Sequence, residues 1–457
     1  MKQALLKALK IIVPEPLRKQ WRLLLSLIGS VRYGFPARKL KFIGVTGTSG
    51  KSTTTAMIYH LLSENGYDVG MISTVGARAG KKNLETGLHV TTPDPFELQK
   101  ILAFMVKRKM EYVVIEASSH ALAQGRLGNV HFDISVFTNI KKDHLDWHKT
   151  WENYAKSKAI LAKKTKPSGK IIVNREDKEM YKFLSDYLGD TYTDRFITYS
   201  FNEILNISES NGNINFRLDN TNFSLPMLGM YNVENALAAI NVAQVLGIDP
   251  KESSTVLKSF PGIKGRMEIM QREPFFVIVD FAHNNDSLIK SLQSANKLKS
   301  GLGKVITVFG SAGLRDVSKR YEMGETGAKY ADIVIITAED PRVESLKEIN
   351  SQIIKGAEKS GGRLVQRFKD HDEYQKYVVE DKKVNRGDIF VFDEESVQNR
   401  FDAIEFAFKI AVPGDVIITE GKGHEQSLCF GETEYPFTDQ EAVRRAIEKL
   451  DSRGVDK

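Results

Sequence analysis

Runs of apolar residues recur along the chain and alternate with segments that carry a helical period. Continuous apolar runs at residues 41–46, 112–117 and 134–139 predict strands buried on both faces. Residues 52–65 and 232–246 have the period and composition of helices. Strands separated by helices are typical of a mostly parallel, doubly wound sheet. The pattern therefore predicts an α/β fold.

This alternation is interrupted once and then restarts. Residues 205–226 alternate between apolar and polar positions and contain an Asn-Gly turn signal, which predicts an antiparallel insert. The glycines at positions 262 and 265 indicate a linker. Beyond the linker, further strands are expected at residues 275–280, 304–309, 333–337, 388–392 and 415–419. The predicted organisation is an extension (1–40), a central domain (41–264) and a C-terminal domain (265–457).

Composition changes this picture only at the N-terminus. The 457 residues are 41% apolar and 27% charged, as in ordinary globular proteins. Residues 1–40 carry nine Lys or Arg against one acid, Glu15. Their apolar run, residues 23–28, is far shorter than the ~20 residues that span a bilayer, and no signal cleavage site follows it. The extension is therefore either a basic helix packed on its own domain or an element that contacts a membrane surface, an anionic ligand or a partner protein.

Two classes of protein are disfavoured. The basicity is local and no nucleic-acid recognition motif is present, so nucleic acid is not expected as a partner. The single cysteine, Cys429, excludes an internal disulfide and fits a reducing compartment. A cytoplasmic protein is expected, either free or at the inner membrane surface.

One glycine-rich segment carries the strongest chemical signal. It follows a predicted strand and opens a predicted helix, so backbone N–H groups and the helix N-terminus can converge on phosphate. Lys51 would neutralise the β and γ phosphates of ATP, and Ser52 would ligate Mg²⁺. The strict Walker pattern needs glycine at position 45, which is Val45, so the segment fits a shorter form, G-T-x-G-K-[ST]-T. The residues predicted to bind ATP here are Gly47, Thr48, Ser49, Gly50, Lys51, Ser52 and Thr53.

This shorter loop resembles that of the Mur ligases, and the resemblance covers nearly the whole chain from about residue 41. It is greatest to the branch that adds the third residue of the peptidoglycan stem peptide, the UDP-N-acetylmuramoyl-tripeptide synthetases. The resemblance implies a P-loop central domain with a mostly parallel sheet and a C-terminal Rossmann-like α/β domain that binds the amino acid. Such enzymes carry an N-terminal domain that grips the UDP-linked sugar. Because the loop here begins near residue 44, that domain is expected to be missing.

The resemblance also implies roles for polar residues that follow the central strands. A carboxylate at the carboxyl end of a strand, such as Glu116, lies where open α/β sheets bind ligands. The implied catalytic residues are Lys51, Glu116, His144 and Lys158, and Ser52, Glu116, His144 and Lys158, the last as a carbamate, would hold Mg²⁺. Lys156 is the competing lysine, whereas His131 and His148 are more typical of structural histidines. The implied substrate contacts are Thr91, Thr92, Ser118, Ser119, Gln124 and Arg126.

Further contacts are implied in the second half of the chain. Asn232 and Asn235 lie three apart on one helix face, where they would read the adenine edge or cap the helix. ATP contacts are implied for Arg266, Asp280 and His283, although Phe281 stands where the family has Tyr, and Asn284-Asn285 where it has Thr-Pro. The implied amino-acid contacts are Arg315, Asp340, Arg342, Gly421 and Glu425. Arg342 would clamp the far carboxylate of diaminopimelate, but Glu339-Asp340 replaces the family's Asp-Asn and leaves the amino acid open.

These features predict an ATP-dependent, ADP-forming acid–amino-acid ligase of peptidoglycan biosynthesis, which serves cell-wall biogenesis, cell shape and cell division. The donor carboxylate would attack the γ-phosphorus of ATP, and the amine would then displace phosphate from the acyl phosphate. ATP and Mg²⁺ are the expected cofactors, and a muramoyl-dipeptide-type donor and a diaminopimelate-like amine the expected substrates. The alternatives are a folylpolyglutamate-synthase-like ligase, a non-catalytic ATP-binding homologue and a simple ATPase switch.

Overall fold

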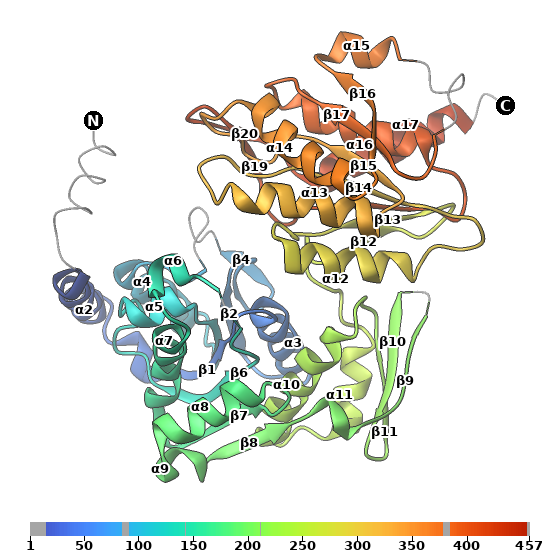
Figure 1. Cartoon of the computed structure of the whole chain (residues 1–457). Coiled ribbons are helices and arrows are strands. Elements are labelled where there is room, and N and C mark those ends of the chain that lie inside the picture. Colours follow the sequence, from blue (N-terminus) through green and yellow to red (C-terminus); the bar gives the residue numbers. More distant parts are fainter. Residues whose placement is uncertain (1–14, 85–90, 142, 211, 378–383, 455–457) are drawn as a thin grey trace. The chain divides into compact units, whose positions relative to one another are not determined.

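A computed structural model describes residues 15–84, 91–141, 143–210, 212–377 and 384–454 (Figure 1). The chain divides into two compact units. The N-terminal unit comprises residues 1–208, 214–226 and 230–261, and the C-terminal unit comprises residues 209–213, 227–229 and 262–457. The C-terminal unit thus includes two short pieces of chain from within the sequence range of the N-terminal unit.

The N-terminal unit is built on an eight-stranded sheet with the order β4-β3-β2-β5-β1-β6-β7-β8. Its core strands pair in parallel, and the β2–β3 and β3–β4 pairs at one edge are antiparallel. The strands are β1 (Lys41–Thr46), β2 (Val69–Ser73), β3 (Gly76–Ala79), β4 (Lys82–Leu84), β5 (Tyr112–Glu116), β6 (Phe132–Phe137), β7 (Thr165–Asn174) and β8 (Phe196–Tyr199). Every residue of β5 and all but the first of β1 are buried, as expected for central strands covered on both faces.

Helices and a small sheet complete this unit. The helices are α2 (Glu15–Arg32), η1 (Pro36–Lys39), α3 (Lys51–Glu64), α4 (Pro95–Lys107), α5 (Ser119–Ala123), α6 (Leu145–His148), α7 (Trp151–Lys163), α8 (Lys178–Leu188), α9 (Asp190–Thr193), η2 (Phe201–Glu203), α10 (Tyr231–Val245) and α11 (Pro250–Leu257). The small sheet has the order β11-β10-β9, with β9 (Ile204–Ser210), β10 (Asn213–Leu218) and β11 (Thr221–Leu225). Helix α11 begins at Pro250 because Asp249 and Glu252 form a reciprocal capping box.

The C-terminal unit is built on a seven-stranded sheet with the order β12-β13-β18-β14-β15-β17-β16. Only β12 at the edge runs antiparallel to its neighbour. The strands are β12 (Glu268–Gln271), β13 (Phe276–Val279), β14 (Val305–Phe309), β15 (Ile333–Ile336), β16 (Arg363–Phe368), β17 (Asp388–Phe392) and β18 (Val416–Thr419), and a separate hairpin pairs β19 (Ser427–Phe430) with β20 (Thr433–Pro436). The helices are α12 (Asn285–Asn296), α13 (Ser318–Tyr330), α14 (Leu346–Lys359), α15 (His371–Gln375), α16 (Gln398–Ile410) and α17 (Asp439–Gly454).

Alternate residues of the C-terminal strands enter two separate cores. Ile306 and Val308 of β14 belong to the core that includes residues of α16 and α17, whereas Val305 and Phe309 belong to the core that includes residues of α12, α13 and α14. This division follows from the two-residue period of a strand. Figure 1 shows the two groups of helices on opposite faces of the sheet.

The structure confirms the α/β fold class and most of the predicted elements. Residues 41–46 form β1 as predicted, the helix expected from residue 52 begins at Lys51, and the antiparallel insert corresponds to β9–β11. The unpredicted strands are β2, β3, β4, β7, β8, β12, β16, β19 and β20. The basic extension contains the 18-residue helix α2, and its first 14 residues lie outside the described residues. Within the described part of the chain, no helix has the length and apolar content needed to cross a bilayer.

Candidate active site

The loop between β1 and α3 packs so closely on its surroundings that a side chain at either of two glycine positions would clash with a neighbouring residue. Gly50 has a φ of +82°, and a Cβ atom there would lie 2.2 Å from Oδ1 of Asn235. A Cβ atom at Gly47 would lie 1.8 Å from Oγ1 of Thr138. The loop is therefore held in one tight conformation between the end of β6 and the start of α10.

The first turn of α3 supplies the positive end of this loop. The N–H groups of a helical first turn have no partner within the helix and carry partial positive charge, which favours a bound anion. Lys51 opens the helix, and its Nζ donates a hydrogen bond to the carbonyl oxygen of Thr48, 2.8 Å away. Ser52 follows and is buried. All seven predicted loop residues thus gather at the start of one helix, in a geometry suited to phosphate.

Glu116 lies at the same sheet edge as the loop. It ends β5, which pairs in parallel with β1, and it stands opposite Val45. Its side chain is buried, and Oε2 accepts a hydrogen bond from the backbone N–H of Thr74 at 2.9 Å. The hydroxyl of Thr92 donates to the carbonyl oxygen of Glu116 at 3.0 Å. A buried carboxylate is therefore placed beside the phosphate loop.

Several residues predicted to contact the substrate adjoin Glu116. Arg126 donates to Oε1 of Gln124 at 2.9 Å and to the carbonyl oxygen of Thr92 at 3.2 Å. Thr91 accepts a hydrogen bond from the hydroxyl of Thr74 at 3.0 Å. Burial lowers the pKa of Arg126 from its ordinary value. The guanidinium of Arg126 is thus held by its neighbours, a suitable arrangement for recognising an anionic substrate group.

Three histidines of this unit, His120, His144 and His148, form a cluster. His144 has a left-handed φ of 51° and precedes α6, and its ring centroid lies 5.0 Å from that of His120. His148 is buried, and its Nε2 lies 3.1 Å from the hydroxyl of Ser119. Ser118 caps α5 through a hydrogen bond from Ala121. No role for His120 could be predicted from the sequence, because its proximity to His144 depends on the fold.

Lys158 projects from α7 to the phosphate loop. Its side chain is 1% exposed, and Nζ donates to the carbonyl oxygen of Gly47 at 2.6 Å. Desolvation, together with the nearby charge of Lys51, lowers the pKa of Lys158 well below its ordinary value. Lys156, the competing lysine, is exposed and forms an ion pair of 2.7 Å with Glu152, which raises its pKa. Only Lys158 therefore combines burial with contact to the loop.

The donor set near the loop fits a magnesium ion bound together with a nucleotide. Mg²⁺ in such sites takes one or two carboxylates, substrate phosphates and water. The hydroxyl of Ser52 and the carboxylate of Glu116 are oxygen donors of this kind. No group of three His, Cys, Asp or Glu residues in the described ranges could hold a metal by itself. His144 offers only nitrogen, and its Nε2 lies 3.6 Å from Oδ2 of Asp143.

The C-terminal unit brings together the three residues predicted there for ATP. Asp280 follows β13, and its Oδ1 accepts from the N–H of Met267 at 2.9 Å. Burial raises the pKa of Asp280. The guanidinium of Arg266 lies 4.4 Å from the ring centroid of Phe281, and Nδ1 of His283 lies 2.9 Å from the carbonyl oxygen of Phe281. Phe281, the departure from the family pattern, is thus the residue that Arg266 and His283 both contact.

Two of the residues predicted to bind the amino acid, Asp340 and Glu425, contact one buried lysine. Nζ of Lys422 donates to Oδ1 of Asp340 at 2.8 Å and pairs with Oε2 of Glu425 at 2.6 Å. Asp340 and Arg342 both have positive φ, 50° and 57°, which is rare for residues other than glycine and is concentrated at functional sites. Lys422 was not among the predicted site residues, although it joins two of them.

A second buried acid adjoins this group. Oε2 of Glu339 has no hydrogen-bond partner among the described residues, and a Cβ atom at Gly421 would lie 2.8 Å from it. Burial raises the pKa of Glu339 to about 8. The backbone N–H of Arg342 donates to the carbonyl oxygen of Cys429 at 3.1 Å. Arg315 is exposed in the segment after β14, so it does not share the buried environment of Glu339.

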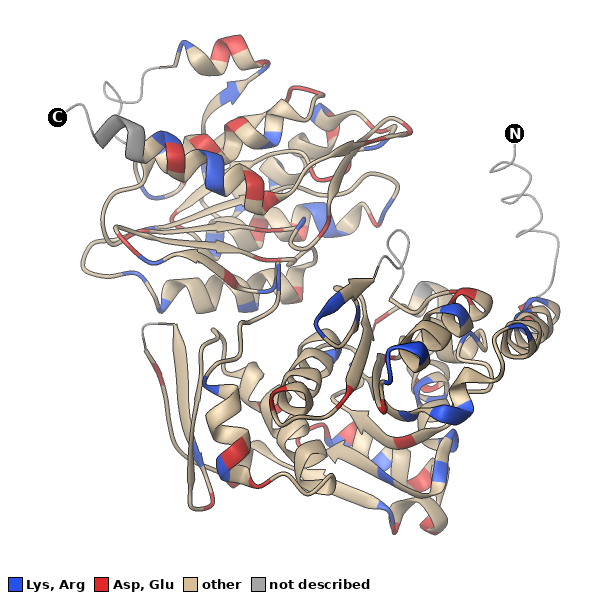
Figure 2. Cartoon of the chain, turned by 180° about the vertical axis from the view of Figure 1, so that it is seen from behind, with Lys and Arg blue, Asp and Glu red and all other residues tan. Residues whose placement is uncertain are grey.

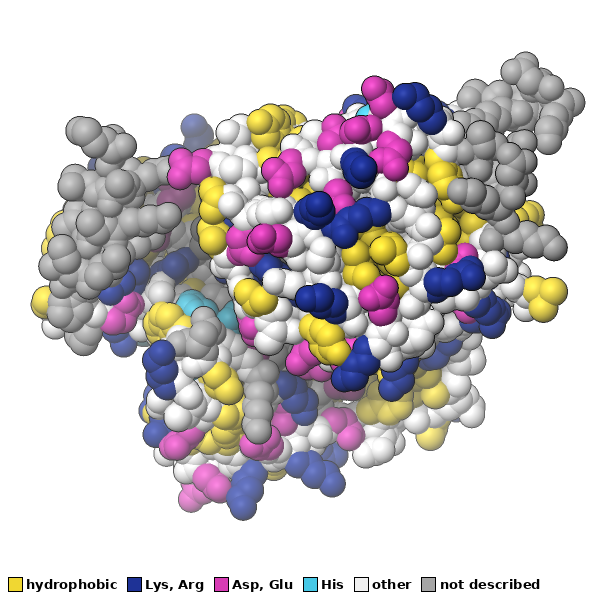
Figure 3. Space-filling model, turned by 45° about the horizontal axis from the view of Figure 1, so that its top comes forward, with side chains coloured by type: hydrophobic (Ala, Val, Ile, Leu, Met, Phe, Trp, Pro, Cys, Tyr) yellow, Lys and Arg dark blue, Asp and Glu magenta, His cyan; other side chains and the backbone are white. Residues whose placement is uncertain are grey.

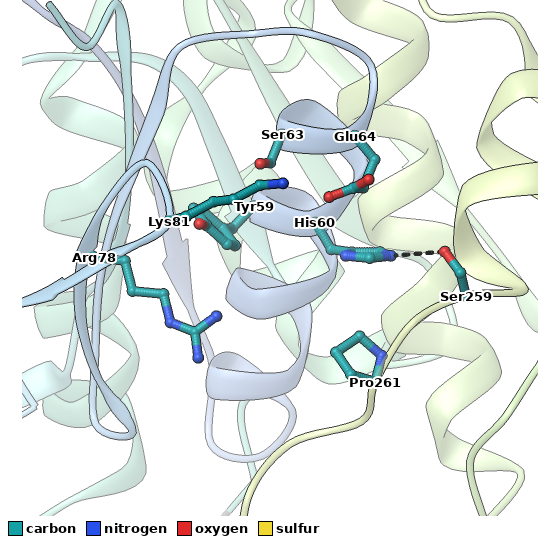
Figure 4. Close-up of a pocket in the computed structure, with 8 residues that line it drawn as sticks. All are labelled: Tyr59, His60, Ser63, Glu64, Arg78, Lys81, Ser259 and Pro261. Atoms are coloured by element: carbon teal, nitrogen blue, oxygen red, sulfur yellow. Dashed lines mark hydrogen bonds between the residues drawn. The ribbon is translucent and has the colours of Figure 1, made fainter.

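A separate pocket of about 390 Å³ lies at the opposite end of α3 (Figure 4). Its lining residues are Tyr59, His60, Ser63, Glu64, Arg78, Lys81, Ser259 and Pro261. Nε2 of His60 lies 3.2 Å from the carbonyl oxygen of Val256, and burial lowers the pKa of His60. Because α3 rises by about 1.5 Å per residue, this pocket is about 15 Å from the phosphate loop along the helix and is not part of that site.

Comparison with known proteins identifies relatives of the whole arrangement. The family model of the Mur ligase middle domain matches residues 45–243, and that of the Mur ligase, glutamate ligase domain, matches residues 265–393. The UDP-N-acetylmuramoyl-L-alanyl-D-glutamate–2,6-diaminopimelate ligase of Clostridium botulinum is 34% identical over 438 residues, which cover 93% of this chain and 82% of the relative.

Solved structures agree with this assignment. The structure of a ligase with that same name superimposes with a TM-score of 0.62 at 27% identity, covering 94% of this chain and 83% of the other. The structure of Escherichia coli FolC in complex with DHPP and ADP gives a TM-score of 0.61 at 19% identity, covering 94% and 92%, which shows a common fold alone.

One expectation is not borne out. The position of the phosphate loop in the sequence predicted that the UDP-binding N-terminal domain is missing. The chain nevertheless spans 82% of the length of its relatives, and the matched region covers more than nine tenths of the chain. The position of the loop in the sequence was therefore not sufficient to predict that a domain is missing.

Proposed function

Because the chain belongs to the Mur ligase family, we propose that it joins diaminopimelate to a UDP-N-acetylmuramoyl-dipeptide in an ATP-dependent, ADP-forming reaction. The observation that carries the proposal is the arrangement of Lys51, Glu116 and Lys158 around one glycine-rich loop. A basic residue on the phosphates, an acid for the metal and a buried lysine are the groups that activation of a carboxylate by ATP requires.

The residues of this chain have distinct tasks in that reaction. The loop N–H groups and Lys51 would bind the phosphates and stabilise the charge that develops on the transferred group. Ser52 and Glu116 would hold Mg²⁺, which when bound spreads the charge of the phosphates. Arg126, held by Gln124 and Thr92, would orient the anionic donor. On the C-terminal unit, Arg266, Asp280 and His283 would contact the nucleoside.

The direct test is phosphate release from ATP with a UDP-N-acetylmuramoyl-dipeptide as donor. We expect release only when both the donor and meso-diaminopimelate are present, and a ligated product that contains both. Phosphate release without an amine would instead indicate an ATPase switch. Release with a folate donor and glutamate would indicate the folate reaction. Binding of ATP without turnover would indicate a non-catalytic homologue.

Lys158 supplies the first prediction. Carbamate formation needs a neutral amine that attacks carbon dioxide and releases a proton, and burial beside Lys51 favours the neutral form of Lys158. Replacing Lys158 by methionine should lower the ligation rate by about 10- to 100-fold. The unsubstituted protein should lose activity in bicarbonate-free buffer and recover it when bicarbonate is added, whereas the variant should respond to neither change.

Lys156→Met is the matched control, since Lys156 lies on the same helix, is exposed and pairs with Glu152. It should retain the full rate and the response to bicarbonate. Mass spectrometry of a peptide containing Lys158 should show the added carbamate if it is trapped chemically. Loss of activity in Lys156→Met with full activity in Lys158→Met would transfer the role to Lys156.

Arg342 supplies a prediction about the amine. A charge-assisted pair between Arg342 and the far carboxylate of diaminopimelate contributes about 1.5–3 kcal/mol, so Arg342→Ala should lower kcat/KM for diaminopimelate by about 10- to 150-fold. Lysine lacks that carboxylate, so the lower kcat/KM expected with lysine should not change in the variant. Steady-state kinetics with each amine measures both effects.

Arg386→Ala provides the control, because Arg386 belongs to the same unit but is exposed and paired with Asp332 at 3.3 Å. It should change neither kcat/KM. An equal loss with diaminopimelate and lysine in Arg342→Ala would show that Arg342 supports the local backbone and does not select the amine.

A further inference from the structure

Helix α2 packs on the N-terminal unit through its small and polar face. Ser26 and Ser30 are fully buried. A Cβ atom at Gly29 would lie 3.1 Å from Cγ of Gln99 in α4, and a Cβ atom at Gly128 would lie 1.8 Å from Oγ of Ser26. Small residues of this kind let a helix backbone approach its neighbours closely. The contact with the protein therefore uses little of the apolar surface of α2.

The apolar face of α2 points away from the protein. Leu17, Trp21, Leu24, Ile28 and Val31 follow the spacing of one helix face, and each is between 45% and 61% exposed. Leu23 and Leu27, at 43% and 47%, widen this stripe. A surface helix ordinarily turns its apolar stripe to the core. The apolar stripe of α2 faces the opposite way, away from the core.

This concentration is specific to α2. Of the eighteen large hydrophobic side chains that are exposed in the described ranges, seven lie on this one helix. The other eleven are spread over many elements, and on the face in Figure 3 groups of hydrophobic side chains lie among charged ones. Scattered apolar residues are normal on a protein surface, whereas a continuous stripe marks a contact surface.

The charge around the stripe is positive. Helix α2 carries four cations, Arg18, Lys19, Arg22 and Arg32, and one acid, Glu15. Glu15 is shared by Arg18 and Arg22 at 3.3 Å and 3.0 Å. Figure 2 marks basic residues along α2, and both Lys19 and Arg32 are exposed. Apolar side chains beside several cations suit a surface that is apolar and negatively charged.

We propose that α2 is a membrane-surface helix that inserts its apolar stripe into the interface of an anionic lipid bilayer while its small face stays on the protein. Leu17, Trp21, Leu24, Ile28 and Val31 would enter the headgroup–acyl boundary. Trp21 has the amphipathic ring that is enriched at that depth. The cations would pair with anionic headgroups, each strengthening the attraction. This function is additional to the ligase reaction.

The charge also argues for lipid over the preceding segment as the occupant of the stripe. Residues 1–14 contain Lys2, Lys7 and Lys10 and no acid. Placing that segment on α2 would add like charge to a positive region, whereas anionic headgroups neutralise both. An attached cationic segment would in addition strengthen binding to the same lipid surface.

The test is sedimentation of the full chain with phosphatidylcholine vesicles that contain phosphatidylglycerol. We expect binding that weakens in high salt and is absent with phosphatidylcholine alone. The double variant Leu24→Asp/Ile28→Asp should bind at least about tenfold more weakly, because it places two charges in the inserted stripe. The double variant Leu205→Asp/Leu302→Asp changes exposed leucines elsewhere and should bind as the unchanged chain does. Both variants should keep ligation of soluble substrates, which separates this test from that of the ligase.

Three results would overturn the proposal. Absence of the unchanged chain from the anionic pellet would show that the stripe does not meet lipid. A dimer in solution that depends on Leu24 and Ile28 would assign the stripe to a second copy. The third result is measured without vesicles, in a variant that lacks residues 2–13. If a collisional quencher reached Trp21 more readily in this variant, the stripe would be assigned to the preceding segment.

Discussion

Replacing Lys51 by methionine is expected to lower donor-dependent phosphate release by about 10²- to 10³-fold, which corresponds to about 2.7–4 kcal/mol of transition-state stabilisation. Methionine keeps most of the length and volume of lysine but cannot neutralise phosphate. Lys51 opens α3 at the end of the glycine loop. The residues that follow it in that helical turn are Ser52, Thr53 and Thr54, so no other side chain there carries a positive charge. Initial rates at saturating ATP and donor measure the effect on kcat.

Lys100→Met provides a matched control for this experiment. Lys100 is an exposed helical lysine that pairs with Glu97 at 3.1 Å, and its loss should leave the rate unchanged. Because Lys51 also donates to the carbonyl oxygen of Thr48, the melting temperature of both variants should be compared. A full rate in Lys51→Met would mean that the loop does not bind the reacting phosphates, and the proposed reaction would have to be abandoned.

Replacing Asp439 by alanine is expected to destabilise the C-terminal unit by about 3–5 kcal/mol. Asp439 begins α17, and both of its carboxylate oxygens accept from Arg400, at 2.7 Å and 2.8 Å, in a pair that is 0% exposed on either side. Arg400 also donates to the carbonyl oxygens of Ala338 and Glu420. Loss of Asp439 would leave a guanidinium charge buried with only these carbonyl partners, which accounts for the size of the effect.

Hydrogen–deuterium exchange of α17 during urea titration measures the stability of this unit separately from that of the other. The control is Glu441→Ala on the same helix, where an exposed pair with Arg445 contributes less than about 1 kcal/mol. The double variant Arg400→Met/Asp439→Leu should be more stable than Asp439→Ala, since it removes both charges. A double variant less stable than the single one would show that the pair itself is strongly stabilising.

The central strands could be predicted because burial on both faces leaves a simple signal. Strands β1, β5 and β14 are nearly continuous apolar runs between polar ends. Edge strands lack that signal: β12 is only half-buried throughout, and β16 begins with exposed residues. Their pairing depends on the neighbouring strand that the fold provides. Burial does not explain every miss, because the internal strands β2 and β7 were not predicted either, although β2 is buried throughout and carries a glycine in a run of only five residues.

The site shows the same limit. The glycine loop was predictable because contiguous residues determine its conformation, and the roles of Glu116 and Lys158 followed from a family resemblance. Lys422 could not be assigned from spacing, since its partner Asp340 is 82 positions away in the sequence. The reversed face of α2 was equally hidden, because a periodic pattern defines an apolar stripe but not what that stripe faces.

The discontinuous makeup of the C-terminal unit limits how it can be exchanged with that of a relative. Leu228 is fully buried in the core that contains residues of α12, α13 and α14. Glu209 accepts from the N–H of Gly229 at 2.7 Å and pairs with Lys297 at 2.9 Å. A chimaera joined at residue 262 would keep these two pieces from one parent and place them against the core of the other. A functional exchange of amino-acid specificity would therefore need three segments to be transplanted together.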